Sequence, residues 1–341
     1  KIELDIPQLK DASYLVEQQL YDAVSTARFT KGDISVSYKA FVPATEDMLI
    51  VDLNMEGNGS VEGTAGISFL GKEEQINKPP LERIFPDVRE HETKPNGVEY
   101  LSRAFVDSVD IPTKGAMALR VSGSTDGKFT LEPGKTVRLV CAFSSNFKSD
   151  DCVATVIKKV EDFTPARQAE IEKSHKEWWR NYWEKSYVSI PDSVIEKQYY
   201  LSLYGMGACS RDMDFPPSIF GTWITKERPY WNGDYHLNYN HMAPYYALYS
   251  ANRIEQADPY ISSMLAQIER GNYYSEKVTG IPGHEEIELA LMRLYQATGE
   301  ERYRKLAAYF IDERGRDPEF FHKEAAARSW SRTDYMDKQP P

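Results

Sequence analysis

The first half of the chain alternates between apolar and polar residues with a period of two, the pattern of a strand that is buried on one face. Turn-forming residues separate the alternating stretches. The clearest stretches are residues 34–42, 48–53, 116–121 and 136–143, and the clearest turns are residues 56–60, 124–128 and 132–135. Many short strands with frequent turns are typical of an antiparallel β-sandwich. We therefore expect an N-terminal β-sandwich over residues 1–160.

A charged stretch at residues 71–97 interrupts this pattern. It contains Lys78-Pro79-Pro80, and consecutive prolines are turn and loop signals. We predict that the stretch forms a long loop or an insertion.

Beyond about residue 160 the apolar positions recur with the period of an amphipathic helix. Thr164-Pro165 is a helix start signal, and Gly299 has the position of a C-cap in a tight helical hairpin. The predicted helices cover residues 166–186, 193–210, 241–252, 258–271, 284–298 and 301–314. We expect a helical linker at residues 161–190 and helix pairs at residues 191–341.

Composition and charge exclude several classes of protein. The chain is 41% hydrophobic and 27% charged, as in an ordinary globular protein. A net charge of −11 without a basic block disfavours nucleic-acid binding. No apolar run approaches the roughly 18 residues of a membrane-spanning helix, so we expect no membrane insertion. The sequence leaves the oligomeric state open.

The first residues carry a prediction about location. The chain begins at Lys1, with neither a methionine nor the apolar core of a signal peptide. This is the pattern of a processed protein. We therefore expect a periplasmic or secreted protein from which a signal peptide has been removed.

Three cysteines, Cys141, Cys152 and Cys209, exclude a disulfide scaffold and a four-thiolate zinc site. Cys141 and Cys152 either pair across a hairpin or stay unpaired and buried, and we favour the second interpretation. His236 and His241 are five residues apart, which is not the spacing of a helical zinc pair. We expect no metal cofactor, although a calcium site of oxygen ligands is compatible with the sequence.

Aromatic residues concentrate between residues 173 and 249, where 18 of 77 positions are aromatic. Some of them must belong to the core. Residues 215–246 also contain Asn, Asp and His side chains, which need polar partners when they are buried. The mixture fits a cleft that binds sugars, and it also fits a satisfied polar core or an interface. The candidate substrate-binding residues here are Trp223, Trp231, Asn232, Tyr235, His236 and His241.

Part of this segment resembles a known family. Residues 215–223 read FPPSIFGTW and residues 229–240 read PYWNGDYHLNYN. This order and spacing resemble a signature of glycoside hydrolase family 95 and related six-hairpin glycosidases, and the resemblance covers about residues 1–280. It implies an N-terminal β-sandwich, a helical linker and an (α/α)6 barrel. The residues after position 160 are fewer than a complete barrel needs, so we expect a partial (α/α) hairpin toroid at residues 191–341.

The family resemblance also implies catalytic roles. The two asparagines of the motif fall on Asn238 and Asn240, and in family 95 they position the water that attacks the sugar. The family inverts the anomeric centre and uses a Glu further along the barrel as its general acid. No segment here clearly matches that Glu.

The tail resembles a second family. Residues 282–291 read PGHEEIELAL, and together with residues 294–300 and 309–315 they are similar to glycoside hydrolase family 127. That family contains β-L-arabinofuranosidases on an (α/α)6 barrel, and its chemistry uses a zinc-bound cysteine. No cysteine follows Cys209 in this sequence, so the resemblance does not extend to that catalytic centre.

Two acidic residues complete the catalytic candidates. His284 and Glu288 are four residues apart and share a face at the start of a predicted helix, either as a site or as a solvated or capping face. Asp234 lies between aromatic residues and either binds sugar hydroxyls, acts as a catalytic carboxylate, or makes a structural hydrogen bond.

The motif itself predicts a local conformation. If residues 234–240 were extended, Asp234, His236, Asn238 and Asn240 would lie on one face, because residues two apart in a strand point the same way. No phosphate-binding loop or nucleophile elbow is present. We therefore predict a glycoside hydrolase that uses an acid and an activated water, with a carbohydrate substrate. The alternatives are a non-catalytic glycan-binding protein on the same fold and a β-L-arabinofuranosidase-like enzyme.

Overall fold

The computed structural model describes residues 1–70, 87–107, 109, 111–224, 229–236, 239–266, 287–316 and 326. The chain divides into two compact units, Lys1–Ser263 and Met264–Pro341. The described strands all lie in the first unit. The predicted domain boundaries near residues 160 and 190 stay predictions.

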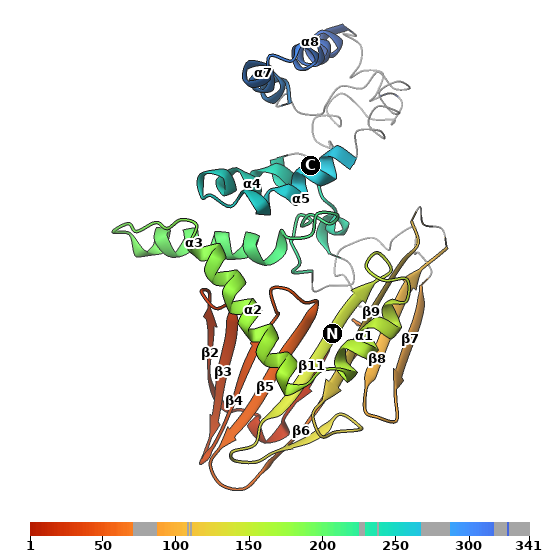
Figure 1. Cartoon of the computed structure of the whole chain (residues 1–341), viewed down its shortest axis with the longest axis vertical. Coiled ribbons are helices and arrows are strands. Elements are labelled where there is room, and N and C mark those ends of the chain that lie inside the picture. The colour runs from red at the N-terminus through yellow and green to blue at the C-terminus, as the bar shows by residue number, and fades with distance from the viewer. Residues whose placement is uncertain are drawn as a thin grey trace. The chain divides into compact units, whose positions relative to one another are not determined.

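The strands of the first unit form two antiparallel sheets (Figure 1). In the described part of the chain, the smaller sheet has the order β1 (Ile2–Asp5), β6 (Val61–Ile67) and β10 (Lys128–Leu131). The larger sheet has the order β2 (Ser13–Gln19), β3 (Val24–Lys31), β4 (Ile34–Phe41), β5 (Met48–Glu56), β11 (Val137–Ser145), β9 (Thr113–Val121), β8 (Glu99–Phe105) and β7 (Val88–Thr93). The predicted strands are thus confirmed as β4, β5, β9 and β11.

The smaller sheet packs against one face of the larger sheet. Val61 of β6 and Leu131 of β10 share a hydrophobic core with Leu53, Leu119 and Leu139 of the larger sheet. All five side chains are almost completely buried, and burial of one such side chain contributes about 1.5–3 kcal/mol. The alternating pattern therefore produces the expected antiparallel sandwich.

Helix α1 (Cys152–Glu161) covers the opposite face of the larger sheet (Figure 1). Its residues Val156 and Val160 pack in one core with Val140 of β11. The carboxylate of Asp151 caps its first turn. This helix is missing from the predicted elements, although its buried residues Cys152, Val156, Ile157 and Val160 recur at helical spacing. Half of its ten residues are β-branched, which also favours a strand.

The predicted start of the long helix is confirmed. Helix α2 (Pro165–Trp183) begins after Thr164, whose hydroxyl accepts a hydrogen bond from the backbone N–H of Arg167 at 3.2 Å. Pro165 occupies the first helical position, where its missing N–H has no intrahelical partner to lose. Ile171 of this helix packs in the same core as α1, so α2 connects the sandwich to the helices that follow.

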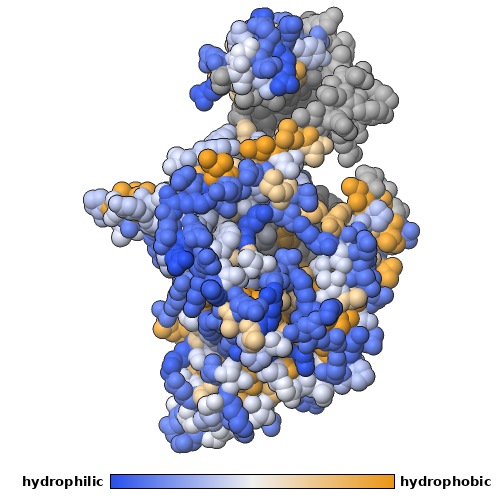
Figure 2. Space-filling model, viewed as in Figure 1, coloured by the Kyte–Doolittle hydropathy of each residue, from blue (hydrophilic) through white to orange (hydrophobic). Residues whose placement is uncertain are grey.

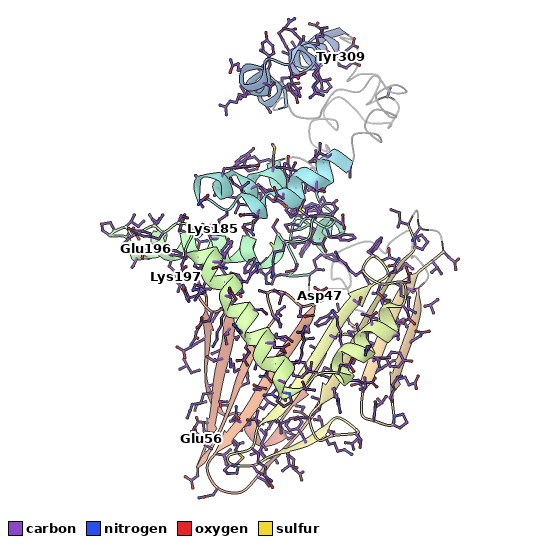
Figure 3. All side chains as sticks on the ribbon, in the orientation of Figure 1. Asp47, Glu56, Lys185, Glu196, Lys197 and Tyr309 are labelled. Atoms are coloured by element: carbon purple, nitrogen blue, oxygen red, sulfur yellow. The ribbon has the colours of Figure 1, made fainter. Side chains whose placement is uncertain are left out.

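Charged side chains fix the connection between α2 and α3 (Ser193–Cys209). Lys185 forms an ion pair with Glu255, and the carboxylate of Glu196 accepts a hydrogen bond from the N–H of Ile190 at 2.7 Å (Figure 3). One contact lies just after the end of α2 and the other at the first turn of α3. The spacing of these residues along the sequence does not predict either contact.

Aromatic residues build the core of the helical part of the first unit. Helices α4 (Tyr239–Ser250) and α5 (Asp258–Ala266) follow α3. The core contains Trp179, Tyr182, Trp183, Leu203, Tyr245 and Leu248. Trp178 stacks on Tyr182 with ring centroids 5.4 Å apart. Part of the aromatic cluster is therefore core, as expected.

The second unit contains the predicted helical hairpin. Helices α7 (Ile287–Thr298) and α8 (Glu301–Arg316) flank Gly299, whose φ of +72° favours glycine. The N–H of Gly299 donates to the carbonyl of Tyr295 at 2.8 Å, which ends α7. The predicted C-cap is confirmed.

Two further predictions are settled in this part of the chain. The predicted loop at residues 71–97 is wrong for Val88–Thr93, which forms edge strand β7; residues 71–86 lie outside the described part. The three cysteines are free, with Cys141 and Cys152 buried. Burial raises the pKa of Cys141 to about 12. The favoured interpretation, unpaired buried thiols, is confirmed.

Candidate functional site

A tight turn follows helix α3 and begins the aromatic segment. Ser218 and Gly221 form an isolated antiparallel bridge, and Gly221 has a φ of +61°. The ring of Trp223 lies so close to this turn that a Cβ added to Gly221 would meet it at 2.7 Å. The turn thus needs glycine for its backbone and for the ring, and it leaves Trp223 half exposed.

The next described segment, residues 229–236, has an unusual backbone. It contains the short 3-10 helix η2 (Tyr230–Gly233), and Trp231 and His236 have φ values of +48° and +47°. Such values are uncommon for residues other than glycine and cost about 1–3 kcal/mol each. The N–H of Ile219 donates to the carbonyl of Asp234 at 3.0 Å, which ties this segment to the preceding turn. Strained backbone that the surroundings hold in place is frequent at functional sites.

The segment joins a carboxylate, an imidazole and two aromatic rings. Asp234 Oδ1 lies 2.9 Å from Nδ1 of His236. The rings of Trp231 and His236 have centroids 5.6 Å apart, and Phe220 stacks on Trp231 at 6.3 Å with an interplanar angle of 14°. Trp231 is 50% exposed, so one aromatic face next to the Asp–His pair is open to solvent. An exposed ring beside polar groups is the arrangement that binds the apolar face and the hydroxyls of a sugar.

His241 lies in a different environment, inside a cluster of tyrosines. Its ring is 5.5 Å from Tyr235, 6.2 Å from Tyr245 and 5.0 Å from Tyr260. His241 is 5% exposed, and burial lowers its pKa. Its Nε2 atom has no hydrogen-bond partner in the described part of the chain. Burial also raises the pKa of Tyr245 to about 12. The cluster joins Tyr235 of the segment to residues of α4 and α5, while the role of His241 in substrate binding stays a prediction.

The remaining candidates fall into three groups. Asn240 is exposed in the first turn of α4. Glu288 is 8% exposed in the first turn of α7, within the second unit. Asn238, His284 and the side chain of Asn232 lie outside the described part of the chain. The structure therefore brings Trp231, Asp234 and His236 together, and the predicted roles of these three and of the other candidates stay predictions.

The expected extended strip at residues 234–240 is wrong. His236 has a left-handed backbone conformation and Asn240 is already helical, because α4 begins at Tyr239. The period-two rule places Asp234 and His236 on one face only in a strand. The two side chains meet instead because the turn at His236 redirects the chain.

Some residues of this region are not identifiable from the sequence alone. Tyr260 contacts His241 from helix α5, 19 positions along the chain, and no motif connects the two. Phe220 stacks on Trp231 although ten residues separate them. Only the glycine at position 221 signals the turn that makes the second contact.

Among the described residues, no group of three His, Cys, Asp or Glu side chains is arranged to hold a metal ion. The expectation of no metal cofactor stays a prediction. A search of the described helices found none long and apolar enough to cross a bilayer.

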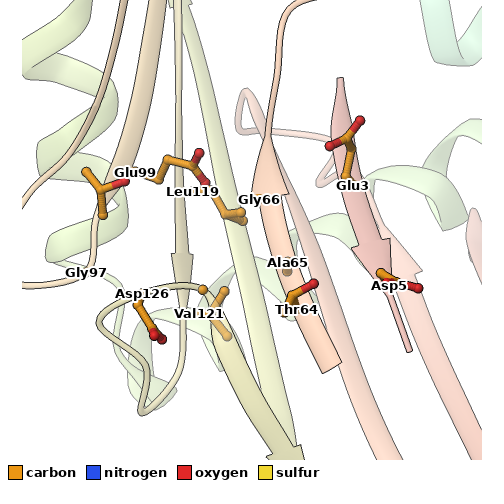
Figure 4. A pocket seen from close by; sticks show the side chains of 12 residues that line it. Glu3, Asp5, Thr64, Ala65, Gly66, Gly97, Glu99, Leu119, Val121 and Asp126 are labelled. Atoms are coloured by element: carbon orange, nitrogen blue, oxygen red, sulfur yellow. The ribbon is translucent and has the colours of Figure 1, made fainter. Parts of the chain in front are cut away.

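A separate pocket of about 320 Å³ lies within the sandwich (Figure 4). Four carboxylates contribute to its lining, those of Glu3, Asp5, Glu99 and Asp126. Glu99 is held by the ring of His91, whose Nε2 lies 2.6 Å from its Oε1. No residue predicted from the sequence as a site residue lines this pocket.

Comparison with known proteins places this segment in a family context. Residues 158–305 match the family model of the glycosyl hydrolase family 95 catalytic domain. The match supports the predicted class, a glycoside hydrolase, for this part of the chain. It includes α2 to α5, the turn at Gly221 and the Asp234–His236 pair. The likeness of the tail to family 127 stays a prediction.

Individual proteins match over smaller shares of their length. The non-reducing end beta-L-arabinofuranosidase of Bifidobacterium longum is 55% identical over 51 residues, which are 15% of this chain and 8% of that protein. A protein from the human microbiome described as a kojibiose phosphorylase has a TM-score of 0.43 and 11% identity, over 65% of this chain and 33% of its own. A bacterial glucoamylase complexed with acarbose has a TM-score of 0.37 and 10% identity, and the match covers 76% of this chain and 43% of the glucoamylase chain. The chain thus spans less than half of the length of each of these three proteins.

Proposed function

We propose that this chain hydrolyses a glycosidic bond of an oligosaccharide or polysaccharide, at a site that includes residues 229–240. The match of residues 158–305 to a glycoside hydrolase catalytic domain carries the proposal. The exposed Trp231 ring beside the Asp234–His236 pair supports it, since stacking surfaces next to hydrogen-bonding groups suit sugars. A periplasmic or secreted location belongs to the same proposal, because polymeric sugars are met outside the cytoplasm.

The proposed reaction is inversion by one acid and one water. Asn238 and Asn240 hold the water in line with the anomeric carbon, because a carboxamide both accepts from and donates to water. Glu288, in the first turn of α7 in the second unit, stays a separate catalytic candidate from the sequence, and the proton donor is left unassigned. Inverting enzymes keep their two carboxyl groups about 6.5–9.5 Å apart to leave room for the water. That separation is what a sugar complex of this protein would test.

We also propose that the helices of the first unit are part of an (α/α)6 barrel. Val194, Ile195 and Leu201 of α3 are 76%, 59% and 39% exposed. Figure 2 shows hydrophobic residues at the surface over the start of α3 and over α4. Apolar helix faces of this kind pack against neighbouring helices in a toroid. The exposed apolar side chains of α3 support the proposal that further helices pack beside the helices of the first unit.

A β-L-arabinofuranosidase-like activity is the second candidate, and the 51-residue match to the Bifidobacterium enzyme favours it. The zinc-bound cysteine implied by family 127 does not fit the described residues. Cys141 and Cys152 lie buried in the sandwich half, and in the described part of the chain Cys209 belongs to no group of three His, Cys, Asp or Glu side chains that could hold a metal ion. A non-catalytic glycan-binding protein is the third candidate.

A glycoside screen separates the candidates. The full chain is incubated with nitrophenyl glycosides, including the β-L-arabinofuranoside, with and without EDTA followed by zinc. We expect turnover that EDTA does not remove, and an inverted anomer as the first product by proton NMR. Sugar binding without turnover would indicate a glycan-binding protein. Activity lost to EDTA and restored by zinc would indicate the second candidate.

A further inference from the structure

The Asp234–His236 contact determines which ring nitrogen carries the hydrogen. A carboxylate only accepts hydrogen bonds, so at 2.9 Å from Asp234 Oδ1 the Nδ1 atom of His236 is the donor. The neutral ring then has its lone pair on Nε2. Among the described residues, His236 makes no second hydrogen bond through that atom.

The backbone holds this pair in place before any ligand arrives. The carbonyl of Asp234 accepts a hydrogen bond from the backbone N–H of Ile219. The backbone N–H of Asp234 donates a hydrogen bond to the carbonyl of Trp231 at 3.1 Å. Gly233 and His236 have φ values of +64° and +47°, which turn the chain sharply on both sides of Asp234. These contacts hold the backbone that carries the carboxylate and the imidazole.

The aromatic side of the pair is equally defined. The Trp231 ring is tilted by 47° against the His236 ring and stacks on Phe220. It remains half exposed, whereas the side chain of His236 is only 21% exposed. A molecule that covers the exposed Trp231 ring would therefore lie beside the His236 imidazole.

We propose that Asp234 is a positioning residue that keeps His236 in its Nδ1–H form, so that Nε2 accepts a hydrogen bond from a sugar hydroxyl while Trp231 contacts the C–H face of the same sugar. The inference rests on the proposed function and adds a selection rule to it. The subsite would favour a sugar with a hydroxyl donor at the edge of an apolar face. It would reject the deoxy analogue, because the imidazole nitrogen would then lose its partner.

A simple bracing role predicts a different result. If the pair only stabilised the loop, loss of either side chain would lower the melting temperature, and sugar binding would fall in proportion to unfolding. If Asp234 acts through His236, the double variant D234A/H236A binds sugar no more weakly than H236A alone. Asp214→Ala is the matched control, since this exposed aspartate lies on the same stretch of chain without a contact to His236.

The first test reads the tautomer directly. Histidine labelled with ¹⁵N in the full chain gives long-range spectra that distinguish Nδ1–H from Nε2–H, and the signal missing in H236A assigns His236. We expect Nδ1–H in the wild type and in D214A, and a shift toward Nε2–H in D234A, because free imidazole favours that form. An Nε2–H signal in the wild type overturns the proposal.

The second test adds sugars. D-galactose, D-glucose, D-mannose, D-xylose, L-arabinose and L-fucose are titrated separately, and His236 Nε2 and the Trp231 indole are followed. We expect at least one sugar to move both signals and to bind about tenfold more weakly to D234A. If no sugar moves them, or if the D234A and H236A effects add in the double variant, the proposal is wrong. Sugar binding with this pattern but without hydrolysis would contradict the proposed function and leave the assignment of Asp234 intact.

Discussion

His175 provides a pH-dependent test of how the sandwich holds the first long helix. It lies in α2 and is 1% exposed, with Nδ1 accepting from the N–H of Ala44 at 3.0 Å and Nε2 donating to the carbonyl of Asp22 at 2.8 Å. A protonated ring has a hydrogen on both nitrogens and loses the first of these bonds. Burial lowers the pKa of His175, an effect that the Asp22 carbonyl opposes and the charge of Arg211 reinforces.

The direction of the pH effect follows from this lowered pKa. In the unfolded chain the imidazole takes up a proton near its ordinary pKa of about 6.5, while in the folded protein it does so only at lower pH. The contribution of His175 to the free energy of unfolding is therefore constant above about pH 6.5, and it falls as the pH drops from there to the pKa of His175 in the folded protein. One proton gives a slope of at most about 1.4 kcal/mol per pH unit.

Urea unfolding followed by tryptophan fluorescence between pH 8 and 5 measures this slope. His175→Gln keeps an acceptor and a donor but does not titrate, so we expect a lower stability at pH 8 by about 1–3 kcal/mol and a shallower loss below pH 6.5. Equal slopes for the wild type and H175Q would refute the reasoning.

Two further predictions concern packing and reactivity. Gly207→Ala adds a Cβ that would meet the Tyr182 ring at 2.8 Å, and the ring cannot move freely because the Tyr182 hydroxyl donates a hydrogen bond to the carbonyl of Leu203. We expect thermal denaturation to show a loss of about 1–3 kcal/mol in the free energy of unfolding. Gly205→Ala, whose new Cβ would have its nearest contact at 3.9 Å, is the control and should lose less stability. Cys141 is buried and its pKa is raised to about 12, so Ellman's reagent at pH 8 should not label it until the protein unfolds. Labelling of Cys141 in the native protein, detected by the mass of its peptide, would contradict this prediction.

The sequence predicts the elements whose pattern is regular. The sandwich strands alternate because one face is buried, and the helical hairpin ends at Gly299 because a left-handed residue is needed there. Strand β7 escapes prediction because all six of its residues are exposed at the sheet edge, so no alternation appears. Helix α1 is not predicted although its buried residues recur at helical spacing, because the β-branched residues that make up half of it also suit a strand of the preceding sandwich.

The candidate site is predicted in composition but not in geometry. Residue types identify Trp231, Asp234 and His236 as candidates, but nothing in the sequence indicates that Trp231 and His236 adopt left-handed backbone conformations. These conformations depend on tertiary contacts such as the one between Ile219 and Asp234. Tyr260 comes from another helix, and such long-range partners leave no local signal.

The measurement that tests the central claim most directly is turnover by Asn240→Ala, with its melting temperature taken on the same preparation. Asn240 is exposed in the first turn of α4, so we expect the variant to fold, and turnover is compared per folded molecule. If it positions the attacking water, kcat on the glycoside found in the screen falls by about a hundredfold or more. Asn252→Ala is the control, at an exposed asparagine just after α4; Asn252 has a φ of +57° and donates a hydrogen bond to the carbonyl of Lys185, so this variant should lose some thermal stability but retain the activity per folded molecule. Wild-type turnover by the Asn240 variant would contradict the placement of the active site at residues 229–240.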